Sequence, residues 1–404
     1  MTGLAGPLRW PSEPDTSPDG GLRARRDALR PLPSAAPTRT MAESWQDWSA
    51  NDPLAAWRWD YLAQFASTPN PFFERWYLQP ALEALDPRHR VKLVRFERGG
   101  ELIGLLPVER ARRYSRWPLP HLASWLHPNC FLGAPLVQYG QETAFWQALL
   151  ARADAEPSRA LFLHLAAMPL ETRLADALFA TCAAQRRRIA LVRRDERAML
   201  GSTLAPVDYL AHALPGKKRK ELRRQQTRLA ELGTVATIRQ DDAQGVHEWI
   251  NAFLSLEARG WKGREGSALA AAPGTAALFR NALTEAAARG KLERLSLTLD
   301  GRPIAMLASF LCPPGAFSFK TAFDEDFARF SPGVLLQLAN LAMLDRKTID
   351  WTDSCAATDH PMIDSLWEQR RPIGRLSVAI GGVARRALFG KLADIELGRL
   401  KRRS

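Results

Sequence analysis

One pattern occurs twice in the sequence and limits the folds that this chain can adopt. An apolar helix, a strand, a tight turn and a second strand are expected at residues 72–108, and the same order recurs at residues 276–311. Gly99-Gly100 joins the strands of the first copy and Asp300-Gly301 joins those of the second, and both pairs are typical of hairpins. Two copies of one mixed unit predict an α/β (α+β) protein with two tandem domains, each a mixed, mostly antiparallel sheet flanked by helices.

The length of 404 residues also favours two domains. The first residues are rich in Pro, Arg, Ser and Asp and show no periodicity, so we expect a disordered extension, with Met1 or Met41 as the true start. The expected parts are this extension, an N-terminal domain without catalytic function, a catalytic C-terminal domain that begins with a basic helix, and a basic amphipathic helix, at residues 1–43, 44–205, 206–382 and 383–404.

The two copies differ in the segment after the second strand. In the second copy, residues 317–323 alternate as in a strand, an acidic loop starts at Asp324, and Ser331-Pro332-Gly333 opens an apolar helix. The start of such a helix has free N–H groups and the positive end of the dipole, which favour an anion. The first copy continues into residues 131–137, which open no helix. We therefore infer one active half and one half retained for structure or for the shape of the substrate site.

The net charge of +13 is concentrated in two segments. Residues 217–231 and residues 383–404 each hold seven basic and two acidic residues. Leucines near one face of the first segment indicate a packed helix, whose charged side could face tRNA phosphates, a membrane surface or only water. The second segment suits an interfacial helix on anionic lipid, or a helix that docks on the protein's own body.

The cysteines and the absence of several motifs argue against whole classes of site. Cys130, Cys182, Cys312 and Cys355 lie far apart without a CxxC pair, which argues against zinc and a disulfide framework and fits a reducing cytoplasm. No apolar run reaches transmembrane length, and no secretory signal is visible. There is no Walker loop, no G-x-G-x-x-G, no H-E-x-x-H and no G-x-S-x-G. We expect a cytoplasmic protein without a metal, with a peripheral position at the inner face of the membrane left open by the basic tail.

A series of short motifs accompanies the repeat. They are Asn70-Pro-Phe-Phe, Gly104-Leu-Leu-Pro107 and Gly133-Ala-Pro-Leu-Val137, then Glu257-Ala-Arg-Gly-Trp261-Lys262-Gly263, Phe319-Lys320-Thr-Ala-Phe-Asp324, Ser331-Pro332-Gly333, Trp351-Thr-Asp353 and Trp367. Their order and spacing resemble the cellulose-biosynthesis (CelD-like) group of tandem GNAT-type N-acyltransferases, relatives of the Fem-type aminoacyl ligases. The resemblance covers about residues 45–382. It departs from the family at residues 366–368, where Leu-Trp-Glu stands in place of the usual Tyr-Lys.

The resemblance implies transfer of an acyl group from acetyl-CoA, or another acyl-CoA, to the amine of a sugar, a polysaccharide precursor or a small metabolite. The strand that contains Phe319 would run beside the pantetheine arm, with a backbone N–H facing the thioester oxygen. The backbone of the following helix start would cradle the pyrophosphate. The residues of this cradle are Ser331, Pro332, Gly333, Val334 and Leu335.

Three charged residues are candidates for catalysis. Glu257 is expected in the last turn of a helix, where the dipole disfavours a carboxylate, so it is a candidate general base or amine ligand, or a solvated surface residue. Asp324 could hold the incoming ammonium or cap a turn. Lys320 could touch a phosphate or the acyl carbonyl, or be an exposed strand lysine.

The acceptor cleft is expected to use Trp261, Lys262, Trp351, Asp353 and Trp367. A tryptophan is equally suited to a core, and Asp353 is chosen for its place at a strand end. Two other functions stay open. One is a Fem-like ligase that uses aminoacyl-tRNA held by residues 217–228, and the other is an inactive scaffold in a polysaccharide or envelope pathway.

Overall fold

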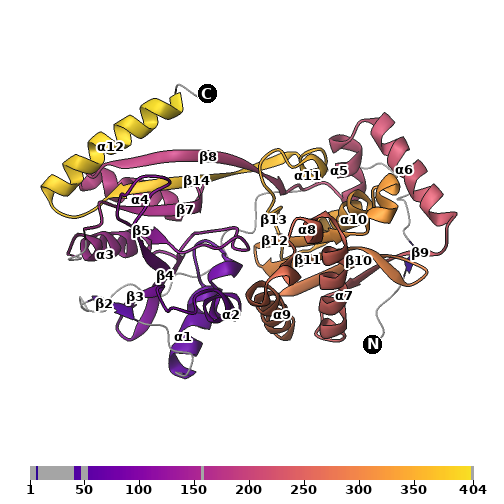
Figure 1. Cartoon of the computed structure of the whole chain (residues 1–404), viewed down its shortest axis with the longest axis horizontal. Coiled ribbons are helices and arrows are strands. Elements are labelled where there is room, and N and C mark those ends of the chain that lie inside the picture. Colours follow the sequence, from indigo (N-terminus) through magenta and orange to yellow (C-terminus); the bar gives the residue numbers. More distant parts are fainter. Residues whose placement is uncertain (1–5, 8–40, 47–52, 156–158, 402–404) are drawn as a thin grey trace.

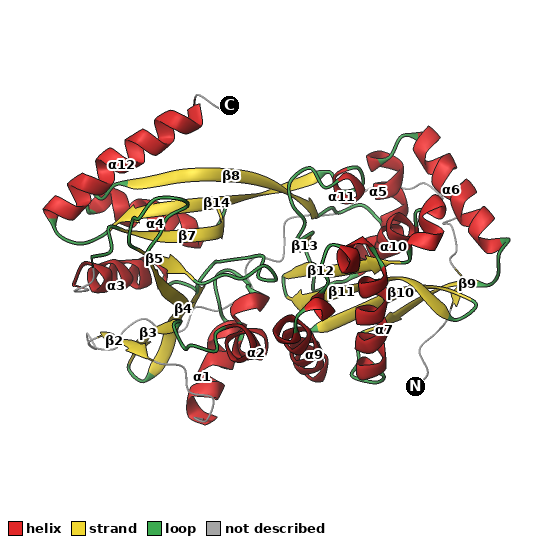
Figure 2. Ribbon diagram, viewed as in Figure 1, coloured by secondary structure: helices red, strands yellow, loops and turns green. Residues whose placement is uncertain are grey.

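One continuous mixed sheet runs through the molecule. The computed structural model describes residues 6–7, 41–46, 53–155 and 159–401 of the 404-residue chain. Over these ranges 14 strands join in the order β1-β9-β10-β11-β12-β13-β8-β14-β7-β5-β4-β3-β2, with β6 paired to β4. Helices cover the sheet on both sides (Figures 1 and 2). The expected α/β class, with mixed and mostly antiparallel strands flanked by helices, is confirmed.

The N-terminal half contains the first copy of the repeat. Its helices are α1 (Pro53–Gln64), α2 (Arg75–Leu85), α3 (Glu142–Ala155) and α4 (Arg173–Ala184). Its strands are β2 (Met41–Gln46), β3 (Lys92–Arg98), β4 (Glu101–Ala111), β5 (His121–Ser124), β6 (Leu136–Val137), β7 (Phe162–Pro169) and β8 (Ile189–Leu200).

The C-terminal half contains the second copy. Its helices are α5 (Pro206–Ala213), α6 (Gly216–Ala230), α7 (Val246–Arg259), α8 (Trp261–Arg264), α9 (Pro273–Ala288), α10 (Pro332–Asn340), α11 (Pro361–Asp364) and α12 (Val383–Lys401), with a 3₁₀ helix η3 (Glu325–Phe330) before α10. Its strands are β9 (Val235–Gln240), β10 (Leu292–Leu299), β11 (Arg302–Cys312), β12 (Gly315–Phe323), β13 (Trp351–Asp353) and β14 (Gln369–Ala379), and β1 (Gly6–Pro7) adds to β9.

Both predicted hairpins are present. Gly99 and Gly100 have φ of 61° and 85°, and Asp300 and Gly301 have φ of 49° and 78°. Two successive residues with positive φ match the right-handed twist of the flanking strands, and glycine reaches this region without steric cost. The residues that the sequence placed at the turns therefore fix the register of β3–β4 and β10–β11.

The faces of the sheet follow the alternation of side chains along the strands. On β10, Leu295 and Leu297 pack in one apolar cluster with Leu335 of α10. Ser296 lies between them and points to the other face, where it accepts a hydrogen bond from Trp249 Nε1 of α7 at 2.9 Å. Helices α10 and α7 are thus held on opposite faces of the second copy.

Strands from the two halves alternate at the centre of the sheet. β13 pairs with β8, and β14 pairs with both β8 and β7. Strand pairing therefore crosses the expected boundary between residues 205 and 206, because β14 comes from the later segment and completes the strands of the N-terminal half. In Figure 1, β8 and β14 span the gap between the two groups of elements.

A buried aromatic cluster also joins the halves. Phe72 of the N-terminal half makes an edge contact with Phe317, at 5.8 Å between ring centroids, and Phe310 stacks on Phe319 at 4.6 Å. Beside this cluster the buried Glu74 forms an ion pair with Lys291 of the other half. The halves thus share one apolar core.

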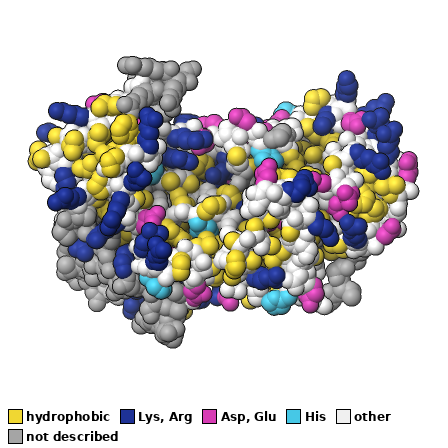
Figure 3. Space-filling view, viewed as in Figure 1, with side chains coloured by type: hydrophobic (Ala, Val, Ile, Leu, Met, Phe, Trp, Pro, Cys, Tyr) yellow, Lys and Arg dark blue, Asp and Glu magenta, His cyan; other side chains and the backbone are white. Residues whose placement is uncertain are grey.

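The structure adds to the sequence-based expectations at both ends of the chain. It shows strands that we did not expect near the N-terminus, and it shows where the C-terminal helix packs. β2 begins at Met41 and β1 covers Gly6–Pro7, so strands occur inside the extension that we expected to be disordered. The rest of that expectation concerns residues 1–5 and 8–40, which lie outside the described residues. At the C-terminal end α12 packs on the body of the protein. In Figure 3 the outline of the molecule dips between the end that carries α12 and the end that carries α6.

In the parts of the chain that the structure describes, no helix is both long and apolar enough to cross a membrane.

Candidate functional site

The strand β12 continues beyond its partner β13. The two strands run parallel and pair only from Gly315 to Phe317 with Trp351 to Asp353. β13 ends there, whereas β12 continues to Phe323 with β11 on its other side. Within the described residues no strand pairs with residues 318–323 on the β13 side. An unpaired strand edge presents N–H and C=O groups that can bind an extended ligand.

Lys320 lies on this part of β12. Its Nζ is 5.0 Å from the ring centroid of Phe131 and 5.7 Å from that of Phe319. Burial lowers the pKa of Lys320 to about 8, and the nearby positive charge of Lys262 lowers it as well, whereas Glu257 opposes the shift. An amine with such a pKa is partly neutral near physiological pH and can accept a proton.

The N-terminal half forms a wall opposite Lys320. Phe131 and His127 belong to the irregular segment that follows β5. Burial, and then the charge of Lys320, lower the pKa of His127 to about 3, so this imidazole is neutral at physiological pH. The Tyr77 hydroxyl donates to the Asn129 carbonyl at 2.5 Å and holds the same segment in place. None of these residues was selected from sequence, because no local pattern shows that they meet Lys320.

Glu257 is in the last turn of α7, as expected, but both carboxylate oxygens are engaged. Oε1 accepts from Lys262 Nζ at 2.8 Å, and Oε2 accepts from the Leu269 N–H at 2.8 Å. Lys262 Nζ also donates to the Thr321 carbonyl of β12 at 3.3 Å. The side chain of Glu257 is buried, so in this arrangement it positions Lys262 beside the strand edge. Its role as a general base stays a prediction.

Asp324 follows β12 and caps η3. Its Oδ1 accepts the Asp326 N–H at 3.1 Å, and its Oδ2 pairs with Arg302. The turn-capping alternative therefore describes its contacts in this structure. Trp261 is 46% exposed, and its backbone N–H donates to Glu325 Oε1 at 2.5 Å.

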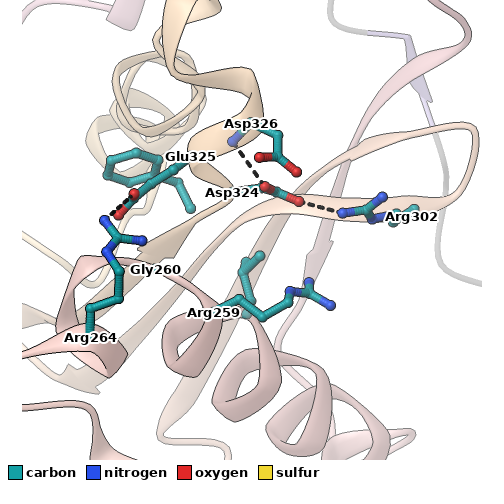
Figure 4. Close-up of a pocket in the computed structure, with 9 residues that line it drawn as sticks. Arg259, Gly260, Arg264, Arg302, Asp324, Glu325 and Asp326 are labelled. Atoms are coloured by element: carbon teal, nitrogen blue, oxygen red, sulfur yellow. Dashed lines mark hydrogen bonds and ion pairs between the residues drawn. The ribbon is translucent and has the colours of Figure 1, made fainter. Parts of the chain in front are cut away.

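A polar pocket of about 360 Å³ lies between the end of α7 and the loop after β12 (Figure 4). Its charged lining residues are Arg259, Arg264, Arg302, Asp324, Glu325 and Asp326. A smaller pocket of about 30 Å³ shares Gly260, Phe323 and Glu325 with it and adds Glu257, Lys262 and Thr321. The two pockets connect the predicted residues of α7 and α8 with the side of β12.

The start of α10 differs from the prediction in its capping. Ser331 has φ of 52°, and its side chain makes no capping hydrogen bond, so the expected Ser331 side-chain cap is wrong. Its carbonyl instead accepts from the N–H groups of Val334, at 2.9 Å, and Leu335, at 3.0 Å. The chain enters α10 directly from η3 in a left-handed conformation, which turns the Ser331 side chain away from the helix.

Gly333 is the position of this helix start that is most restricted by packing. Gly333 and Pro332 are buried, and Leu335 belongs to the core. A Cβ atom at position 333 would lie 2.7 Å from Met362 Cε of α11 and 3.4 Å from Phe323. The predicted pyrophosphate cradle is therefore covered by the flexible end of one methionine.

Asp353 is fully buried between two arginines. It pairs with Arg371 Nη1 at 2.9 Å and with Arg197 Nη1 at 3.2 Å, and its Oδ1 accepts the Cys355 N–H at 2.8 Å. The cluster joins three neighbouring strands, because Asp353 lies on β13, Arg371 on β14 and Arg197 on β8. It therefore holds together the strands that the two halves exchange at the centre of the sheet. No sequence pattern indicated this cluster, since the strands that supply it lie far apart along the chain.

The two remaining predicted tryptophans differ in environment. Trp351 is half-buried, packs against Phe317 at 5.5 Å between centroids, and lies 4.3 Å below the Arg371 guanidinium. Trp367 is fully buried in a core cluster with Tyr209 and Ile363, which matches the core alternative. The structure thus brings Glu257, Trp261, Lys262, Lys320 and Asp324 together along β12, and it separates them from Trp367.

Comparison with known proteins identifies a domain type and a fold. Residues 216–360 match the family model described as an acetyltransferase (GNAT) domain. No curated protein matches the chain. Among solved structures, FemX aligns with a TM-score of 0.54 at 10% identity over 84% of this chain and 98% of its own.

Two further structures align over a similar part of the chain. The C-terminal (DUF2156) domain of a putative lysylphosphatidylglycerol synthetase from Agrobacterium fabrum has a TM-score of 0.51 at 12% identity, covering 83% of this chain and 94% of that chain. A conserved protein of unknown function from Bacteroides thetaiotaomicron has a TM-score of 0.51 at 14% identity, covering 83% and 99%. At these identities the similarity shows the fold.

Proposed function

We propose that this chain, whose residues 216–360 match a GNAT acetyltransferase domain, transfers an acyl group from an acyl-CoA thioester to an amine beside β12. The observation that carries the proposal is an unpaired strand edge next to a half-buried lysine with a lowered pKa. The edge offers backbone groups to the donor, and Lys320 offers a base to the acceptor. The resemblance to the CelD-like group supports the same reaction.

The donor would bind as an additional strand. The pantetheine arm contains amide groups, which can pair with the open edge of residues 318–323. A backbone N–H of this edge would then donate to the thioester oxygen as negative charge develops on it. The pyrophosphate would lie at the start of α10, where the Gly333 N–H and the helix dipole favour an anion, after Met362 moves away from Gly333. The N–H groups of Val334 and Leu335 already donate to the Ser331 carbonyl.

The reaction would proceed by direct attack. The nitrogen of the neutral acceptor amine bonds to the thioester carbonyl carbon, and the carbon–sulfur bond breaks. Lys320, when neutral, takes the proton that the amine nitrogen loses and passes a proton on to the leaving CoA thiolate, so the products are an amide and the free thiol and Lys320 is neutral again. With a pKa of about 8, roughly one tenth of the Lys320 side chains would be neutral at pH 7.

The acceptor would enter through the polar pocket of Figure 4. Three carboxylates line it, and one of them, Asp326, is exposed. Asp324 and Glu325 pair with Arg302 and Arg264, which leaves Asp326 to attract an ammonium group, and the pocket lies beside β12, where the thioester would be placed. An amino sugar, a polysaccharide precursor or a small amine would fit this chemistry. The acceptor's protonated amine must release its proton to water before attack, because only the neutral amine is a nucleophile.

One observation favours a second candidate, an aminoacyl-tRNA-dependent ligase. Helix α6 exposes a row of cations at the end of the molecule where Figure 3 shows dark-blue side chains. They are Lys217, Lys218, Lys220, Arg223, Arg224 and Arg228. Phosphate contacts of this kind predict tRNA binding that weakens steeply with salt. Filter binding at low and high salt tests this candidate, and an absence of retention at low salt removes it.

The thermal stability of the purified chain with donor fragments tests the main proposal. Acetyl-CoA and CoA should both raise the melting temperature, because a ligand that binds only the folded state stabilises it. Adenosine 3′,5′-bisphosphate, which lacks the pantetheine arm, should give a smaller shift. Release of free thiol on addition of an amine panel then reports turnover. If no acyl-CoA shifts the melting temperature, the acyltransferase proposal fails and the inactive scaffold is favoured.

A further inference from the structure

Helix α12 lies at the end of the molecule opposite to α6, beside β8 and β14 (Figure 1). Phe389 and Ala393 are buried in an apolar cluster with Phe162 and Ala190, and the rings of Phe389 and Phe162 are 5.4 Å apart. One apolar face of α12 is therefore buried against the protein's own body. Leu388 and Ile395 of the same helix are 47% and 53% exposed.

Two polar contacts hold the acidic residues of α12 against the body. Asp394 pairs with Arg188 at 2.5 Å, and Glu396 accepts the Tyr114 hydroxyl at 2.8 Å. These contacts engage both carboxylates of the described part of the helix. Lys391 is exposed as well, so α12 presents a lysine and apolar side chains to solvent beside the Asp394–Arg188 pair.

A pocket of about 700 Å³ opens between α12 and the loop of residues 114–119. Its lining is largely apolar and consists mainly of Trp117, Pro118, Leu119, Phe162, Leu392 and Ile395. Trp117 is 45% exposed, which is unusual for so large an apolar side chain. A pocket of this size and character accommodates a hydrocarbon chain better than a polar metabolite.

One arginine, Arg116, lines the pocket together with Glu396, and two more arginines lie just before it in the chain. Arg112, Arg113 and Arg116 are exposed, and the Arg116 guanidinium is 5.3 Å from the Trp117 ring centroid. Residues 112–119 contain no Asp or Glu. Arginine suits a phosphate because its guanidinium can donate two parallel hydrogen bonds, and tryptophan prefers the boundary between apolar and aqueous phases.

We propose that this end of the molecule docks on an anionic phospholipid bilayer. One acyl chain enters the pocket beneath α12, and Arg112, Arg113 and Arg116 pair with lipid phosphates around it. An anionic lipid fits better than an acidic protein because an apolar cavity and a purely basic loop lie side by side. The proposal does not depend on acyl transfer, since it concerns the end of the molecule that lies far from β12.

Vesicle sedimentation with matched charge reversals tests the docking. The full chain should sediment with vesicles of phosphatidylglycerol and phosphatidylcholine but not with phosphatidylcholine alone. The triple variant Arg112→Glu, Arg113→Glu and Arg116→Glu should lose roughly 100-fold or more in vesicle affinity, since each cation near the surface contributes substantially. Lys217→Glu, Lys218→Glu and Lys220→Glu on α6 change the net charge equally and should lose less than about threefold. Melting temperatures of both variants check that they are folded.

The chain pocket has its own readout. Lipids brominated in the acyl chains should quench part of the tryptophan fluorescence, and Trp117→Phe should remove that part. Ile395→Asp, at an exposed position, should weaken vesicle binding without lowering the melting temperature. The proposal is overturned if the wild type ignores anionic vesicles or if the α6 variant loses as much affinity as the loop variant. Unchanged binding by Ile395→Asp, together with equal quenching in Trp117→Phe, overturns the entry of an acyl chain.

Discussion

The two halves of the molecule pair their strands in the same order but differ in how far one strand extends beyond its parallel partner. In the N-terminal half β3, β4 and β5 pair in turn, and β5 then runs parallel to β7. In the C-terminal half β10, β11 and β12 pair in turn, and β12 then runs parallel to β13. β5 ends at Ser124, one position after its pairing with β7, whereas β12 continues to Phe323. An open strand edge therefore exists beside the parallel pair of the second half.

The segment after β5 has a different position and use. It crosses toward the C-terminal half, where Phe131 lies over Lys320 and His127 adds to the burial of the same region. The N-terminal half, which has no open edge beside its parallel pair, thus supplies side chains around Lys320 of the C-terminal half. A repeated sheet can therefore keep its pairing order in both copies while the strand edge beside the parallel pair stays open in the second copy.

The largest expected effect concerns the cluster that holds the exchanged strands. Asp353→Asn leaves Arg197 and Arg371 buried without a counter-ion, so we expect the free energy of unfolding to fall by about 3–5 kcal/mol. Urea denaturation followed by circular dichroism measures it. Asp350→Asn, at an exposed position three residues earlier, should change stability by less than about 0.5 kcal/mol. Equal stability of both variants would show that the halves do not depend on this cluster.

The next effect tests whether Lys320 of the C-terminal half acts as the base in acyl transfer. Lys320→Met keeps most of the length of the side chain and removes the base, so kcat/KM for acyl transfer should fall by about 100-fold or more. The wild-type rate should rise with pH up to about pH 8, because the folded-state pKa of about 8 means that Lys320 loses its proton there. Lys347→Met, at an exposed position, is the control and should retain full activity. A variant at position 320 with the wild-type pH profile would contradict the proposed base.

A smaller change tests whether the N-terminal half sets the properties of Lys320. Phe131→Ala removes the ring above the ammonium group and admits water, so the pKa of Lys320 should rise from about 8 toward its ordinary value. The midpoint of the pH–rate profile should then move up by about one unit, and the rate at pH 7 should fall roughly tenfold. Phe179→Ala on α4 is the matched truncation at an exposed site. An unshifted midpoint would mean that the wall does not act on Lys320.

The smallest effect concerns the start of α10, where the pyrophosphate cradle is predicted. Gly333→Ala places a methyl group against Met362 and into the predicted cradle, so the Kd for acetyl-CoA should rise by about threefold to tenfold. Calorimetric titration gives the Kd, and Met362→Ala alone should leave it equal or lower. Gly382→Ala has open space around it and serves as the control. Unaltered affinity in Gly333→Ala would place the pyrophosphate elsewhere.

Local patterns in the sequence predicted the elements but not their long-range pairing. The hairpins at Gly99-Gly100 and Asp300-Gly301, and the helix opened by Pro332, are encoded by residues next to one another. The exchange of β8 and β14 depends on pairing across about 180 residues, which no local propensity specifies.

The candidate site was predicted in part for the same reason. The structure brings Lys320, Lys262 and Glu257 to one strand, because their motifs lie in the same half, and their predicted catalytic and binding roles stay predictions. His127 and Phe131 were missed since only tertiary contact brings them to Lys320. Ser331 failed as a side-chain cap because η3 delivers it in a left-handed conformation, and Trp367 is an example of a tryptophan that serves the core.

A crystal structure with a non-hydrolysable acyl-CoA analogue tests most directly whether the C-terminal half is the working one. We predict that the pantetheine arm pairs with residues 318–323 of β12, that its carbonyl lies near Lys320, and that the pyrophosphate displaces Met362 from Gly333. Density for the analogue beside β5 in the N-terminal half, or a β12 edge left empty while the analogue binds elsewhere, would contradict the assignment of the working half.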